Sequence, residues 1–92
     1  MEEILKILGL TEQERKVYIA CLKLGSAKAS EIALKAGIER KASYYTLELL
    51  ISKGMLTESI KSGVKYYSTT DVKLLLKKIE EEKEIKENAL KE

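Results

Sequence analysis

The chain has 92 residues, of which 45% are hydrophobic and 35% charged, so it has the composition of one small folded domain rather than of a disordered chain. Histidine is absent and the single cysteine, Cys21, lies in the apolar run YIACL, which excludes an internal disulfide and argues against a zinc site and against acid–base or nucleophilic catalysis. We therefore expect a protein that is not an enzyme and that holds no metal or cofactor. The sequence shows no signal peptide and no apolar run near the ~18 residues of a membrane span, so we expect a cytoplasmic protein.

The formal net charge is only +2, but the basic residues are unevenly distributed. Residues 28–67 contain seven Lys or Arg and four Glu, a net charge of +3, whereas residues 1–27 carry no net charge and residues 68–92 carry −1. A basic excess in the middle of the chain indicates contact with nucleic acid. Abundant Lys and Glu with one Asn and one Gln is the pattern reported for hyperthermophile proteins, so we also expect a thermophilic source.

Three helices are predicted in the first part of the chain. A short one covers residues 1–8 and ends at a glycine. A second begins at Thr11, which has the spacing of a capping box with Glu14, and ends at Gly25. A short third helix is predicted over residues 30–35, with small alanines on its inward side that allow another helix to approach closely.

The stretch 37–54, GIERKASYYTLELLISKG, predicts the helix around which the rest of the chain is organised. Its N-terminal half is polar, basic and aromatic, whereas its C-terminal half is apolar, so one end packs in a core and the other meets a partner. A helix, a short turn containing Gly37 and a second helix form the helix-turn-helix pattern. In such proteins the N-terminal residues of the second helix contact bases in the major groove of DNA.

After the central helix the pattern changes from helix to strand. Residues 55–60 and 64–69 have strand-like composition and flank a three-residue loop, residues 61–63, that contains a glycine. A β-hairpin directly after a helix-turn-helix is the wing of a winged helix. We therefore predict a mainly α fold with a small β-hairpin, forming a winged helix-turn-helix DNA-binding domain over residues 1–70.

A further helix is predicted over residues 71–92, with Asp71 as its N-cap. Its apolar stripe is clear as far as Ile79 and thins beyond it. Because helix-turn-helix proteins usually bind two half-sites as dimers, we expect this helix to be the dimerisation element of a homodimer. The residues expected in the core or at the dimer interface are Leu49, Val72, Leu75, Leu76 and Ile79.

The run LGLTEQERKVYIACLKLGSAKASEIALKAGIERKASYYTLELLISKGMLTE, followed by KYYSTTDVKLLL, resembles the winged-helix domain of the TrmB-like transcriptional regulators of archaea. The resemblance covers roughly residues 8–76 and implies a sequence-specific regulator that binds double-stranded DNA. Glu39 stands where that family often has proline, and Ser43 where it usually has valine. Larger members of the family carry a C-terminal domain that binds sugars, for which these 92 residues leave no room, so we expect no small-molecule effector site.

The candidate contacts to DNA lie on the two helix-turn-helix helices and on the wing. Arg40 and Lys41 occupy the first turn of the central helix, where cations oppose the helix dipole and so call for an outside partner. Tyr44 matches the tyrosine of the family, and the adjacent Tyr45 either faces the partner or packs. Ser30 contacts a phosphate, caps its helix or does both, and the wing lysines either contact phosphates or protect strand edges. The candidate DNA-binding residues are Lys28, Ser30, Arg40, Lys41, Tyr44, Tyr45, Lys61 and Lys65.

The alternative is a winged helix that contacts another protein and does not bind DNA. The low net charge favours this alternative, as do Glu39 and Glu48 on the central helix. We favour a DNA-binding transcriptional regulator because the basic excess surrounds the helix that would read the major groove.

Overall fold

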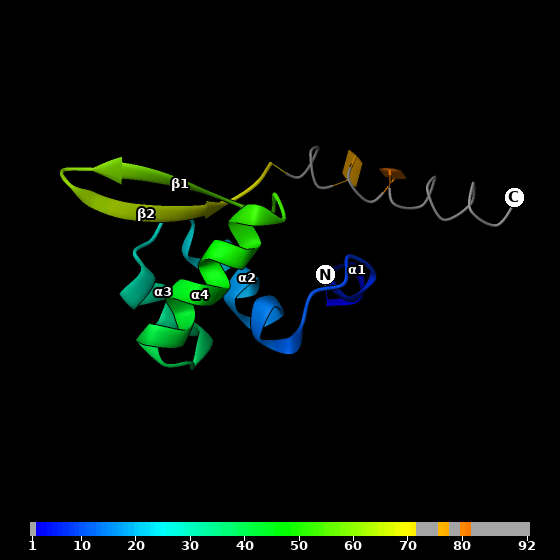
Figure 1. The fold of residues 1–92 in the computed structure, drawn as a ribbon, viewed down its shortest axis with the longest axis horizontal. Coiled ribbons are helices and arrows are strands. Elements are labelled where there is room, and N and C mark those ends of the chain that lie inside the picture. Colours follow the sequence, from blue (N-terminus) through cyan, green and yellow to red (C-terminus); the bar gives the residue numbers. More distant parts are fainter. Residues whose placement is uncertain (1, 72–75, 78–79, 82–92) are drawn as a thin grey trace, which may run out of the picture.

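The computed structural model describes residues 2–71, 76–77 and 80–81. Within residues 2–71 it contains four helices followed by a two-stranded antiparallel sheet, and the hairpin lies across one side of the helices with its turn projecting beyond them (Figure 1). This arrangement confirms the winged helix-turn-helix fold. The elements are α1 (Glu2–Ile7), α2 (Glu12–Leu24), α3 (Ala29–Ala36), α4 (Arg40–Ser52), β1 (Leu56–Lys61) and β2 (Val64–Thr69).

The helix predicted over 71–92 lies largely outside the described residues. None of the helices in the described part of the chain is both long enough and apolar enough to cross a membrane.

Local hydrogen bonds set the start and the end of α2 as the sequence predicted. The Glu14 amide donates to Thr11 Oγ1 at 3.2 Å, and the Thr11 amide donates to Glu14 Oε1 at 3.1 Å. These two bonds complete the capping box and satisfy two amides that a helix start leaves without partners. At the other end the Gly25 amide donates to the carbonyl of Cys21 at 2.9 Å.

Helix α3 begins one residue earlier than predicted. Lys28 occupies the N-cap position and its amide donates to Glu31 Oε1 at 3.0 Å, so Ser30 is the second residue of the helix and does not cap it. The helix ends at Gly37, whose φ of 72° places it in the left-handed region that residues with a Cβ adopt rarely. The resulting turn directs the chain into α4.

The core joins side chains from all four helices and the hairpin. Cys21 is completely buried, and burial raises the pKa of its thiol to about 12, so it behaves as a small apolar side chain. Ser43, at the position where valine was expected, is also completely buried and donates to the Arg40 carbonyl at 2.5 Å. The largest buried apolar side chains are Leu5, Leu10, Val17, Tyr18, Ile32, Leu47, Leu50, Met55, Leu56 and Tyr67.

A partly buried ion pair connects the start of α2 to the end of α4. Lys53 Nζ lies 2.7 Å from Glu14 Oε2, and Glu14 is only 3% exposed. Burial on its own would raise the pKa of Glu14, but the bonds from Lys53 and from Thr11 together outweigh it and lower the pKa. The sequence indicated the capping role of Glu14 but not its partner 39 residues away.

The hairpin turn has two residues rather than the three predicted. Lys61 belongs to β1 and faces Val64 of β2, which leaves Ser62 and Gly63 as the loop. Both have positive φ, 51° and 76°, as a type I′ turn requires.

The base of the hairpin is attached to the segment before α3 by a short backbone bridge. The Ala27 amide donates to the Tyr67 carbonyl at 3.1 Å, and the Tyr67 amide donates to the Ala27 carbonyl at 2.8 Å. This bridge fixes β2 beside the N-terminus of α3, which positions the wing relative to the two helices of the helix-turn-helix.

Candidate nucleic-acid interface

An open groove of about 310 Å³ lies between the N-terminal ends of α3 and α4 and the hairpin. Its walls come from three segments that are far apart in the sequence, and Tyr67, which is 3% exposed, also lines it. The backbone bridge between Ala27 and Tyr67 holds two of these segments, the start of α3 and the hairpin, beside each other. Five of the eight predicted DNA contacts line this groove: Lys28, Ser30, Arg40, Tyr44 and Lys65.

The groove is positively charged. Three of its lining side chains are the cations Lys28, Arg40 and Lys65. No carboxylate is among the lining side chains. The cations stand on three different elements, so they surround the groove instead of following one helix. An anionic ligand with several separated charges, such as a phosphate backbone, matches this distribution.

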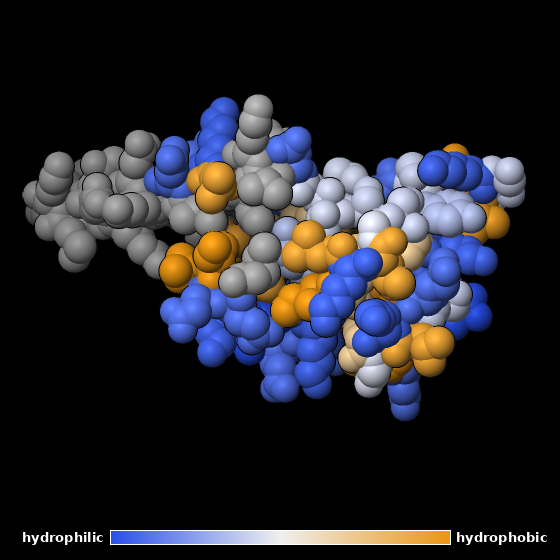
Figure 2. Space-filling view, turned by 180° about the vertical axis from the view of Figure 1, so that it is seen from behind, coloured by the Kyte–Doolittle hydropathy of each residue, from blue (hydrophilic) through white to orange (hydrophobic). Residues whose placement is uncertain are grey.

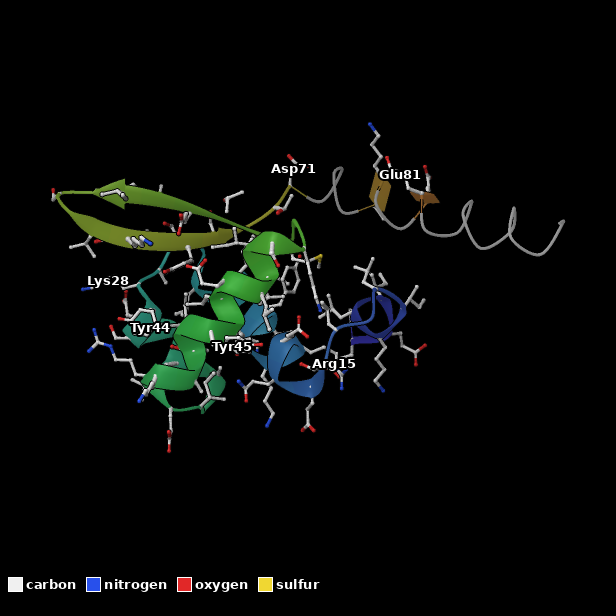
Figure 3. All side chains as sticks on the ribbon, viewed as in Figure 1. Arg15, Lys28, Tyr44, Tyr45, Asp71 and Glu81 are labelled. Carbon is white, nitrogen blue, oxygen red and sulfur yellow. The ribbon has the colours of Figure 1, made fainter. Side chains whose placement is uncertain are left out.

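Arg40 is held against Tyr44 one turn further along α4. Its Nε and one terminal nitrogen both donate to Tyr44 Oη at 3.3 Å, and its guanidinium carbon lies 6.0 Å from the centre of the tyrosine ring. Figure 3 shows Tyr44 and Lys28 on the same end of the helices, below the hairpin. Both side chains line the groove at the start of the helix that would enter DNA.

The two groove lysines differ in what already surrounds them. Lys28 is exposed beside the start of α3, and no described carboxylate forms an ion pair with it. Lys65 Nζ lies 3.7 Å from Glu58 Oε2 across the hairpin, with 53% of the lysine side chain exposed. Exposed pairs of this kind are weak, so the lysine can exchange the carboxylate for a phosphate.

Three predicted contacts lie outside the groove. Lys41 and Tyr45 are exposed on α4, and the 68% exposure of Tyr45 favours the alternative in which it faces a partner rather than the core. Lys61 lies on the hairpin face opposite to Lys65, and its Nζ is 5.6 Å from the ring centre of Tyr66. The structure therefore separates the two wing lysines that the sequence treated alike.

The predicted interface residues are described only in part. Leu49 is half-buried and Leu76 is 51% exposed, whereas Val72, Leu75 and Ile79 lie outside the described residues. Figure 2 shows the rear face of the molecule, where hydrophobic side chains are interspersed among hydrophilic ones.

The fold and the charged groove define a winged helix-turn-helix protein whose cationic side lies between the N-terminal ends of α3 and α4 and the wing. Residues 5–73 match the family described as "Sugar-specific transcriptional regulator TrmB", and the chain belongs to that family, as its sequence predicted. It is 33% identical over 84 residues to the HTH-type sugar sensing transcriptional regulator TrmBL1 of Pyrococcus furiosus. The match covers 88% of this chain but only 24% of that relative, so the chain spans about a quarter of the relative's length.

Solved structures share the same architecture. A possible transcriptional regulator from Methanosarcina mazei has a TM-score of 0.71 at 16% identity, covering 96% of this chain and 82% of its own. The YusO protein of Bacillus subtilis has a TM-score of 0.67 at 23% identity, covering 97% and 67%. Sso10a-2, a DNA-binding protein from Sulfolobus solfataricus, has a TM-score of 0.57 at 25% identity, covering 89% and 87%. The first two support the fold alone.

Proposed function

We propose that this chain binds double-stranded DNA in a sequence-specific way and regulates transcription. The observation that carries the proposal is the groove, in which cations from α3, α4 and the wing converge with no carboxylate among the lining side chains. In this arrangement α4 enters the major groove, and the wing lies along the neighbouring backbone. Similar proteins agree with this proposal, since one is a transcriptional regulator and another a DNA-binding protein.

The groove residues divide into two kinds of contact. Lys28, Ser30 and Lys65 stand on the rims formed by α3 and the wing, where they would hold phosphates and set the register of the protein on the duplex. Arg40 stands at the start of α4 and would contact a base, with guanine as the partner that matches a guanidinium best. Lys41 and Tyr45 would contact the duplex from the exposed side of the same helix.

A homodimer is part of the proposal. One chain presents one helix, α4, to the major groove, whereas helix-turn-helix proteins usually bind two half-sites about 34 Å apart. The interface would be formed by Leu49, Leu76 and the remaining residues of the predicted 71–92 helix. Sugar sensing is a property of the Pyrococcus relative. This chain matches only 24% of that relative, so we do not extend sugar sensing to this chain.

A winged helix that contacts protein is the second candidate, and one observation favours it. Glu39 and Glu48 are both exposed on or beside α4, so the face that would enter DNA is not uniformly positive. An interface with a protein would depend little on salt, whereas each phosphate contact makes binding weaker as salt rises.

Fluorescence anisotropy with a mixed-sequence duplex tests the proposal. We expect binding at roughly 50 mM salt that falls steeply by 200 mM, because several phosphates would be neutralised. The test variant is the charge reversal Lys28→Glu inside the groove. Its matched control is the charge reversal Lys23→Glu outside the groove. Only the first should abolish binding. No binding by the wild-type chain at low salt would refute the proposal, and a pull-down for a protein partner would follow.

A further inference from the structure

Helix α4 presents one continuous exposed face, and Glu48 lies at its centre. At about 100° per residue, Glu48 is roughly 40° from Tyr44 and roughly 60° from Tyr45 around the helix, so it stands between the two tyrosines. The same arithmetic places it roughly 160° from Leu50 and from Thr46, which are both buried. Glu48 therefore points away from the core and toward whatever α4 meets.

Glu48 also has its charge available for a partner. Among the described residues no lysine or arginine forms an ion pair with it, and no donor forms a hydrogen bond with its side chain. Its charge acts on the groove, because it adds to the raised pKa of Tyr67, of which burial is the main cause. An isolated carboxylate at this position would repel the phosphates of a bound duplex unless a base offers it a hydrogen-bond donor.

The major-groove edges of the bases differ in what they offer a carboxylate. Guanine presents two acceptors, and thymine presents an acceptor and a methyl group. Adenine presents an amino donor beside the N7 acceptor, which repels a carboxylate, whereas cytosine presents its N4 amino group alone. Cytosine is therefore the base that Glu48 can accept from without an opposing acceptor.

Building on the proposed DNA binding, we propose that Glu48 accepts a hydrogen bond from the N4 amino group of a cytosine in the major groove and so selects cytosine at one position of the site. Arg40 and Glu48 are eight residues apart on α4, or about 12 Å along the helix axis. Each base pair advances the duplex axis by about 3.4 Å, so this length spans at most three or four base pairs, and the cytosine should lie within that distance of the base read by Arg40. The carboxylate that weighed against DNA binding thus becomes a source of specificity.

Selection from a pool of random duplexes, followed by sequencing, tests the assignment. We would compare the wild-type chain with Glu48→Gln and with the matched control Glu39→Gln, which removes the same charge from the N-cap of α4. The wild-type site should contain a cytosine column that Glu39→Gln retains. Glu48→Gln should change that column to adenine, because a glutamine amide pairs with adenine N6 and N7. In anisotropy titrations, exchanging the bases at this column should reverse a preference of about tenfold.

Two results would overturn the assignment of Glu48. One is that selection returns the same DNA sequence for all three proteins. Both glutamine variants would then bind every duplex more tightly to the same degree, as expected from the loss of one negative charge. The other is a wild-type chain that binds duplexes but shows no preference for cytosine within three or four base pairs of the base read by Arg40. Failure of the wild-type chain to bind any duplex at low salt is a different outcome, because it would remove the proposed function and this inference together.

Discussion

Replacing the groove lysines one at a time should reduce the salt dependence of DNA binding by an amount that follows from the structure. Each neutralised phosphate contributes about 0.9 to the slope of log affinity against log salt. Lys28 and Lys65 are the two groove cations that we assign to phosphates, so together they should contribute about −1.8 to the slope per chain. Lys28→Gln should reduce the magnitude of this slope by about 0.9. Lys65→Gln should reduce it by less, since Lys65 already shares its charge with Glu58 3.7 Å away.

The assay is fluorescence anisotropy with one duplex at several salt concentrations, from roughly 50 to 200 mM. Lys23→Gln is the matched control, because Lys23 lies in the last turn of α2 and lines a separate hollow with Lys16 and Lys35. This control should retain the wild-type slope. Circular dichroism and thermal unfolding of each variant would show that the exposed substitutions leave the fold intact.

Equal slopes for Lys28→Gln and Lys23→Gln would refute the placement of the phosphate backbone in the groove. Binding would then depend on charges elsewhere on the molecule. A slope that falls for both variants would indicate a diffuse electrostatic attraction rather than defined contacts from α3, α4 and the wing.

Three further predictions concern base readout, acid stability and assembly. Arg40→Ala should relax base preference at a cost of about 1–3 kcal/mol while the fold survives; an unchanged preference in duplex selection would remove Arg40 from base readout. The lowered pKa of Glu14 means that its stabilising contribution is present above its ordinary pKa of 4.5 and is lost as the pH falls through the folded-state value. In urea unfolding, the free energy of unfolding should therefore fall more between about pH 6 and pH 3 for the wild-type chain than for Glu14→Gln. Equal decreases for the two proteins would contradict the role of the ion pair between Glu14 and Lys53. Ile79→Glu should weaken dimerisation in analytical ultracentrifugation, and an unaltered dimer would move the interface elsewhere.

The helices and their ends could be predicted from sequence because they depend on neighbours within a few positions. Thr11 and Glu14 satisfy each other's amides three residues apart, and Gly37 adopts a conformation that other residues disfavour. The start of α3 was predicted at Ser30, but Lys28 occupies the cap position because Glu31 bonds to its amide. A serine near a helix start is a good cap only where the backbone bends at that residue.

The hairpin shows where local patterns become ambiguous. Its existence and position could be predicted, because β-branched and aromatic residues alternate on either side of a glycine. The length of its turn could not, since Lys61 is compatible with both a strand and a loop. The pairing of Lys61 with Val64 decided the question and placed Lys61 on the opposite face from Lys65.

The sequence by itself determined the order of the elements, the charge of the middle segment and the residue types available to meet DNA. It could not determine which of the eight candidate residues lie around the same groove, because Lys28, Arg40 and Lys65 are separated by turns whose directions depend on packing. Only the tertiary structure decided that, through the backbone bridge between Ala27 and Tyr67, which holds the wing beside α3. A bridge of a single residue pair has no periodicity to detect, and yet it places Lys65 of the wing beside Lys28, while the packing of α4 on α3 adds Arg40 to the same groove.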